Sequence, residues 1–111
     1  MKSFKVESYI CTLCYDKKNP NRIAWIHCRG TNKENMYIYF HKTSNDSPIV
    51  AGTNNQVNAD GTGGYCFRPY YMYPFYVDLL RNENPVFVNI DDKDFITLST
   101  SVEPVGENEQ P

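Results

Sequence analysis

Residues 65–81 read YCFRPYYMYPFYVDLLR, and the expected fold is organised around this stretch. Its second half has the pattern of an amphipathic helix. Pro74 suits a first helical position, where its missing N–H leaves no bond unmade. Phe75 and Leu79 lie four residues apart and therefore share one face. Because a polar run and a proline then stop the pattern, the sequence predicts one helix near residues 72–82.

On both sides of this helix the chain has the β-branched and aromatic content of strands. The predicted strands are residues 4–15, 22–29, 36–41, 65–67, 85–90 and 95–101. Turn residues separate most of them, and Trp25 and His27 are expected to share one face of their strand. This order predicts an α+β fold, in which the helix packs on one antiparallel sheet of about six short strands. A partly closed barrel is the alternative.

At 111 residues the chain is predicted to be a single domain, residues 1–111, with a long polar loop at 43–64 and an acidic polar tail at 102–111. Fifteen of the 22 loop residues are Asn, Asp, Gly, Ser or Thr, and loops of this length are often functional. No apolar run approaches the roughly 20 residues of a membrane span, and the N-terminus lacks the apolar segment of a secretory signal. We therefore expect a cytoplasmic protein that does not contact membranes.

The net charge of −2 conceals an asymmetry between the two halves. Residues 1–50 hold eight Lys or Arg against four Asp or Glu, whereas residues 51–111 hold three against nine. A basic half attracts phosphates, and attraction between the halves favours self-association. Overall acidity argues against nucleic acid as a partner, because nucleic-acid-binding proteins show a basic footprint.

The helix pattern leaves a surplus of aromatic side chains in front of it, next to a glycine-rich loop. Tyrosine offers rigid apolar area with a hydroxyl group, which suits ligand pockets and subunit interfaces. An arginine beside such rings can stack on a base or hold a phosphate. The candidate ligand-binding residues are Tyr65, Phe67, Arg68, Tyr70, Tyr71 and Tyr73, with Arg22 and Arg29 as further sources of charge.

The four cysteines raise the separate question of metal binding. Cys11 and Cys14 have the C-x2-C spacing of zinc sites, and Cys28 and Cys66 would complete a set of four. A second pair at this spacing is missing, and on a regular strand residues three apart face opposite ways. No metal or other cofactor is therefore assigned; if a metal is present, these four cysteines are the candidate ligands.

Three functions follow from these observations, in descending order. The first is a non-enzymatic, homo-oligomeric binding module that holds, or sequesters, a small polar or nucleotide-like ligand through the aromatic and arginine residues. The second is a protein-interaction or inhibitor protein that docks a partner through the same aromatic surface. The third is a zinc protein or a small Cys/His hydrolase, placed last because the sequence shows no complete catalytic set.

Overall fold

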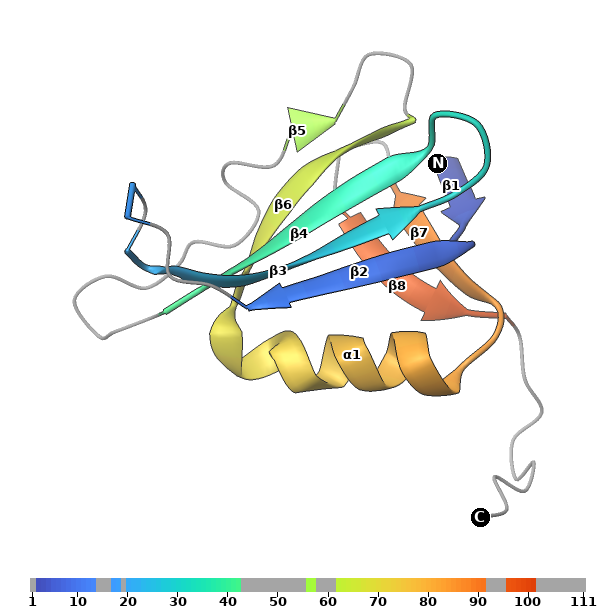
Figure 1. Ribbon diagram of the computed structural model, residues 1–111. Helices are drawn as coiled ribbons and strands as arrows, with labels where there is room; N and C mark the ends of the chain where they lie inside the picture. Colours follow the sequence, from blue (N-terminus) through green and yellow to red (C-terminus); the bar gives the residue numbers. More distant parts are fainter. Residues whose placement is uncertain are drawn as a thin grey trace.

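The computed structural model describes residues 2–13, 17–18, 20–42, 56–57, 62–91 and 96–101. Two β-sheets and one helix make up this part of the chain (Figure 1). In chain order the elements are β1 (Lys2–Lys5), β2 (Ser8–Leu13), β3 (Arg22–Arg29), β4 (Asn35–His41), β5 (Gln56–Val57), β6 (Gly63–Pro69), the short 3-10 helix η1 (Tyr70–Met72), α1 (Tyr73–Asn82), β7 (Val86–Ile90) and β8 (Ile96–Thr100).

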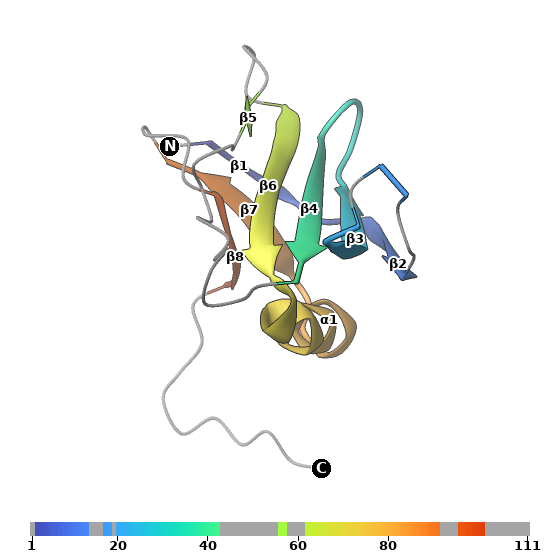
Figure 2. The same ribbon diagram turned by 90° about the vertical axis from the view of Figure 1, so that its left-hand side faces the viewer.

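One sheet has the strand order β1-β7-β8 and the other has the order β2-β3-β4-β6-β5. Figure 2 shows them as two layers, with α1 along one end. The core lies between these elements and takes alternate residues from the strands, including Ile26, Ile38 and Val88, together with Leu80 from α1. Because both sheets turn an apolar face inward, the two layers bury one continuous core.

The chain passes from one sheet to the other at Val6 and Glu7. The Val6 N–H donates to the Val86 carbonyl at 2.8 Å, and the Glu7 N–H donates to the Arg29 carbonyl at 2.7 Å. Neighbouring backbone groups thus bond to different sheets. The single strand predicted for residues 4–15 is therefore wrong in its middle, where it divides into β1 and β2.

The five-stranded sheet is mixed, whereas the sequence predicted antiparallel pairing throughout. β4 and β6 run parallel, with Asn35 opposite Gly63 and His41 opposite Pro69. Parallel neighbouring strands need a connection of a dozen or more residues, and this requirement explains why a long polar segment separates β4 from β6. Part of that segment is itself a strand, because β5 pairs antiparallel with β6. Most of the predicted loop, including its apolar residues 49–51, and the tail fall outside the described residues.

The predicted α+β class with one helix is confirmed. α1 begins one residue after the predicted start, with Pro74 in its first turn, and β7 and β8, which match the predicted strands 85–90 and 95–101, pair antiparallel. The strands form two sheets rather than a closed barrel. Over the described residues, no helix has the length and apolarity to cross a bilayer.

Candidate functional site

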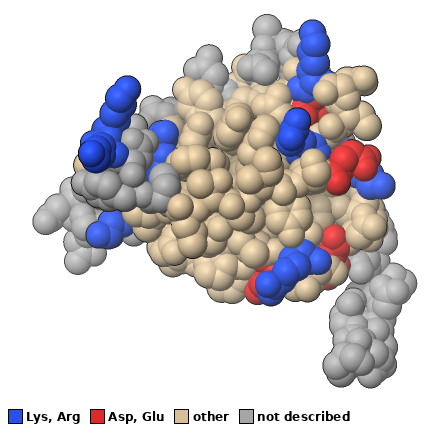
Figure 3. Space-filling view, in the orientation of Figure 1, with Lys and Arg blue, Asp and Glu red and all other residues tan. Residues whose placement is uncertain are grey.

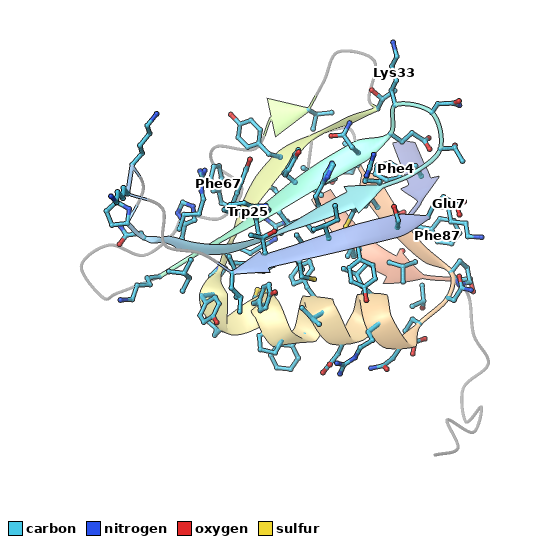
Figure 4. The ribbon with its side chains drawn as sticks, in the orientation of Figure 1. Phe4, Glu7, Trp25, Lys33, Phe67 and Phe87 are labelled. Carbon is cyan, nitrogen blue, oxygen red and sulfur yellow. The ribbon has the colours of Figure 1, made fainter. Side chains whose placement is uncertain are left out.

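The two faces of strands β3, β4 and β6 differ in composition. The residues that face the core are mostly aliphatic or thiol side chains with almost no exposed area. The alternate positions face away from the other sheet and carry rings that are half-buried. We call these rings the outer aromatic face: Trp25, His27, Tyr37, Tyr39, His41, Tyr65 and Phe67 (Trp25 and Phe67 are labelled in Figure 4).

Strand register brings these rings into contact. His27, Tyr37 and Tyr65 lie opposite one another on the three strands, and Trp25, Tyr39 and Phe67 form the next row. The His27 and Tyr37 rings stack with centroids 4.0 Å apart and planes 4° from parallel. Tyr37 and Tyr39 are near-parallel with centroids 5.9 Å apart, and Tyr39 and Phe67 lie 5.6 Å apart. The seven rings form one connected network centred on Tyr39.

Arg22 completes this network with a cation. Its guanidinium carbon lies 4.0 Å from the centroid of the Tyr39 ring and 5.8 Å from that of Phe67. Simple alternation would put Arg22 on the same side as the buried Ala24. An irregularity in the β3–β4 register between these two residues changes that alternation, as a β-bulge does when it re-aims a side chain. The bulge therefore turns a charged side chain onto the rings.

Arg22 also contacts His41. The Arg22 Nε–H donates to Nε2 of His41 at 3.3 Å, so this ring nitrogen acts as an acceptor. Burial, together with the positive charge of Arg22, lowers the pKa of His41 below its ordinary value of 6.5. Burial likewise lowers the pKa of His27, with Arg29 adding to the effect. Both imidazoles are therefore neutral at neutral pH, and the fixed charge at this end of the face belongs to arginine.

Strands β2, β3, β4 and β6 contain no aspartate or glutamate. In Figure 3 this side of the molecule is uncharged over most of its area. Lys and Arg side chains lie on its left-hand margin and also at the upper right and lower margins, and the acidic side chains in view lie toward the right-hand and lower margins. Among the described residues, the outer aromatic face therefore has arginine at its edge and no carboxylate on its own strands.

The structure divides the predicted ligand-binding residues among several places. Tyr65, Phe67 and Arg22 come together on the outer aromatic face. Arg29 is exposed at the other end of β3. Since a strand rises about 3.3 Å per residue, the seven residues between Arg22 and Arg29 correspond to roughly 23 Å. The two arginines therefore do not hold the same small ligand.

Arg68 lies on the opposite face of β6 from its neighbour Phe67, because successive strand residues face opposite ways. It is only 7% exposed. Its Nε donates to the Tyr76 hydroxyl at 3.1 Å, Nη1 to the Phe67 carbonyl at 2.7 Å and Nη2 to the Ile96 carbonyl at 2.6 Å. Arg68 thus ties β6 to α1 and β8 and does not contribute to the outer aromatic face.

Tyr70, Tyr71 and Tyr73 form a separate group at the start of the helical segment. Tyr70 and Tyr73 stack with centroids 5.8 Å apart, and Tyr73 also packs edge-on against the core residue Phe40 at 5.1 Å. Burial, followed by the nearby Cys11, raises the pKa of Tyr73 to about 12. Tyr71 is 69% exposed. Tyr73 thus packs against the core, Tyr70 and Tyr71 are exposed, and the ring contacts of Tyr70 and Tyr73 do not reach the outer aromatic face.

Five residues of the outer aromatic face were missing from the predicted site: Trp25, His27, Tyr37, Tyr39 and His41. The sequence carried a signal for them, because rings alternate with core residues at positions 25 and 27 of β3 and at 37, 39 and 41 of β4. The prediction instead weighed the density of aromatic residues within one stretch. Density along the chain does not measure proximity in a sheet, where neighbours come from different strands.

Cys11, Cys28 and Cys66 are free thiols, and Cys14 lies outside the described residues. Burial raises the pKa of Cys28 to about 12 and that of Cys66 to about 11. Both thiols are therefore protonated at neutral pH, and the thiolate is the form that attacks substrates or binds metals. In the part of the chain that the structure describes, no three His, Cys, Asp or Glu side chains are grouped to hold a metal ion.

Comparisons with known proteins supply no further guide to this site. No family model, no curated protein and no solved structure matches the chain.

Proposed function

We propose that the protein is a non-enzymatic binding module that holds a nucleotide-like ligand on the outer aromatic face. A base or similar flat heteroaromatic group contacts the rings around Tyr39, and Arg22 contacts a phosphate or another anionic group of the same ligand. Holding such a ligand out of solution is the simplest outcome of this chemistry. The same binding step would serve either to store and release the ligand or to sequester it.

The observation that supports this proposal is the placement of Arg22 over Tyr39, within a network of seven rings. Aromatic side chains bind bases by stacking, and arginine binds phosphate through its fork of N–H groups. The ring faces inside the His27–Tyr37 pair are already covered. The ligand is therefore expected at the exposed edges of the network, beside Arg22 and Phe67.

The non-enzymatic part of the proposal rests on the state of the candidate nucleophiles. Cys28 and Cys66 face the core rather than the outer aromatic face, and their raised pKa values keep them protonated. His27 and His41 lie among aromatic rings, where stacking and edge contacts surround them. These environments suit recognition of a ligand better than chemical attack on it.

A panel of purine and pyrimidine mono-, di- and cyclic nucleotides, with free nucleosides and inorganic phosphate, tests this proposal by melting temperature. A ligand at about one hundred times its Kd adds about 2.7 kcal/mol to the free energy of unfolding, which such a scan detects. Tyr39→Ala is expected to abolish the shift. The matched control is Tyr71→Ala, which removes an exposed tyrosine outside the network. No shift across the panel would contradict the proposal.

A second candidate is docking of a protein partner, including a second copy of this chain. It is favoured by the exposure of large apolar side chains on the helical segment and on β2, where Ile10 lies opposite His27 and therefore borders the outer aromatic face. Tyr71 and Phe75 are 69% and 70% exposed on the helical segment, and Ile10 and Leu13 are exposed on the edge strand β2. Sedimentation of the wild type and of Phe75→Ser tests it; a monomer at every concentration removes self-association from this candidate.

We include a cytoplasmic location in the proposal. The support for it is that the three described cysteines are all free thiols, two of them fully buried. Reducing compartments maintain thiols in this state, whereas oxidising compartments favour disulfides. Fractionation of the producing cells tests the location directly.

A further inference from the structure

A groove of about 350 Å³ lies between α1 and β8, on the inner side of β6. α1 and β8 face each other across this side of the molecule in Figure 2. The walls are mainly apolar, and among the described lining residues Arg68 carries the only charge. The groove is lined by residues that include Phe75, Tyr76, Leu79, Ile96, Leu98 and Arg68.

Arg68 is the one charged side chain that is buried among the described residues. All three groups that accept its hydrogen bonds are neutral: two backbone carbonyls and the Tyr76 hydroxyl. No carboxylate of the described residues pairs with it; the exposed pair Arg81–Asp78 involves other side chains. Burial of a charge without an opposite charge is costly, and folds normally compensate it.

The hydrogen-bonding capacity of Arg68 is also only partly used. A guanidinium has five N–H groups, and the three bonds account for one each on Nε, Nη1 and Nη2. One N–H group on each Nη atom is left for another acceptor. Because Arg68 lines the groove, a ligand there can reach these groups.

We propose that this groove binds a small carboxylate with a straight apolar chain. The carboxylate accepts hydrogen bonds from Nη1 and Nη2 of Arg68 and supplies the missing negative charge. The chain extends between Leu79 of α1 and Leu98 of β8. This site uses the inner face of β6, whereas the nucleotide-like ligand uses the outer face, so neither proposal depends on the other.

The size of the groove sets the length of the ligand. Small-molecule pockets range from about 300 to about 1,000 Å³, so this groove is at the small end of that range. A medium-length chain fits it better than a long-chain fatty acid or a membrane lipid does. The apolar lining, the buried charge and the volume together favour a medium-chain carboxylate.

Calorimetric titration of the full chain with hexanoate, octanoate and decanoate tests the proposal. Each added methylene group is expected to lower Kd roughly fourfold until the groove is filled. Octanoate is expected to bind about tenfold or more tightly than 1-octanol, which has the same chain without the charge. Equal affinity for octanoate and octanol, or no binding of either, would overturn the proposal.

Two variants locate the ligand. Leu98→Trp fills the groove with a larger side chain and is expected to abolish binding of octanoate, while Leu13→Trp, on the edge strand β2, serves as the matched control and leaves it unchanged. Arg68→Met is expected to remove the preference for octanoate over octanol. If Arg68→Met does not fold, Leu98→Trp decides the question. Wild-type affinity in a folded Leu98→Trp protein contradicts the assignment.

Discussion

Tyr39 and Phe40 are neighbours on β4, yet they meet different environments. Phe40 is 0% exposed and packs edge-on against Tyr73 and Tyr76 in the core. Tyr39 is half-buried, and it contacts rings from β3 and β6 as well as a guanidinium group. The inner face is a packed interior that excludes water. The outer face keeps polar ring edges in contact with water.

Similar side chains thus stabilise the core on one face, whereas on the other face we propose that they recognise a ligand. Full burial of an aromatic side chain contributes about 1.5–3 kcal/mol to the free energy of unfolding, because its apolar surface is removed from water. Ring pairs add about 0.5–1.5 kcal/mol each. A network of half-buried rings therefore stabilises the sheet less than its size suggests, and its exposed edges remain available for a ligand.

The largest expected effect is a difference in the free energy of unfolding between variants of Phe40 and Tyr39. Phe40→Ala is expected to lower the free energy of unfolding by about 3–5 kcal/mol, because it removes a buried ring and leaves a cavity. Tyr39→Ala is expected to cost about 1–2 kcal/mol, since it removes half-buried ring contacts. Urea denaturation measures both. If Tyr39→Ala costs as much as Phe40→Ala, the outer aromatic face is a structural element and the comparison fails.

The buried thiols of the inner face make the stability of the protein depend on pH in the alkaline range. The pKa of Cys28 is raised from 9.0 to about 12, so the folded state keeps a proton that the unfolded state loses. Stability is therefore complete below about pH 9 and falls above it, by about 1.4 kcal/mol per pH unit for this thiol. Denaturation at about pH 8 and about pH 10 measures the loss. Cys28→Val is expected to reduce it; an unchanged slope would show that other groups cause it.

Arg22→Gln is expected to have a smaller effect on stability. It removes the cation from the Tyr39 ring at a partly exposed position, where such contacts contribute about 0.5–1 kcal/mol. Its effect on nucleotide affinity should exceed its effect on stability, because in the proposed complex the charge contacts the ligand. Arg29→Gln is the matched control, and its free energy of unfolding is expected to change by no more than about 0.5 kcal/mol. Equal loss of affinity in both variants would point to long-range attraction instead of a specific contact.

The smallest expected effect occurs at acidic pH and reports on the outer face. Because the pKa of His41 is lowered, mainly by burial and then by Arg22, the unfolded state binds the proton more readily than the folded state. Stability is therefore lost as pH falls below the ordinary histidine value of 6.5. Denaturation at about pH 7 and about pH 5 is expected to show this loss, and His41→Gln to reduce it. The pKa of His27 is also lowered, so His27 accounts for part of the stability loss that remains in the His41→Gln variant.

The helix was predictable from sequence because its signals are local. Pro74 and the Phe75–Leu79 spacing report a backbone conformation that neighbouring residues determine. Most strands were also predictable from alternation. The change of sheet at Val6 and Glu7 was not, since the residues on both sides have strand character and only their distant partners differ. The parallel pairing of β4 with β6 is equally non-local.

The candidate site was predictable only in part, and Arg68 and Arg22 show why. Strand alternation alone is enough to place Arg68 on the opposite face from Phe67, but the prediction followed the density of aromatic residues along the chain and grouped the two together. Arg22 is a different case, because its direction depends on an irregularity in the β3–β4 register that no residue type announces. Chain order identified the strand that carries two of the seven rings of the outer aromatic face, and only the sheet supplied the other five.

The passage of the chain between the two sheets has a consequence for amide hydrogen exchange. The Val6 amide hydrogen is held by the sheet that contains β7, and the Glu7 amide hydrogen by the sheet that contains β3. One dipeptide therefore reports on the opening of both sheets. If the sheets open as one cooperative unit, the two amides exchange with the same free energy. If one sheet opens first, its amide exchanges early while the neighbouring amide remains protected.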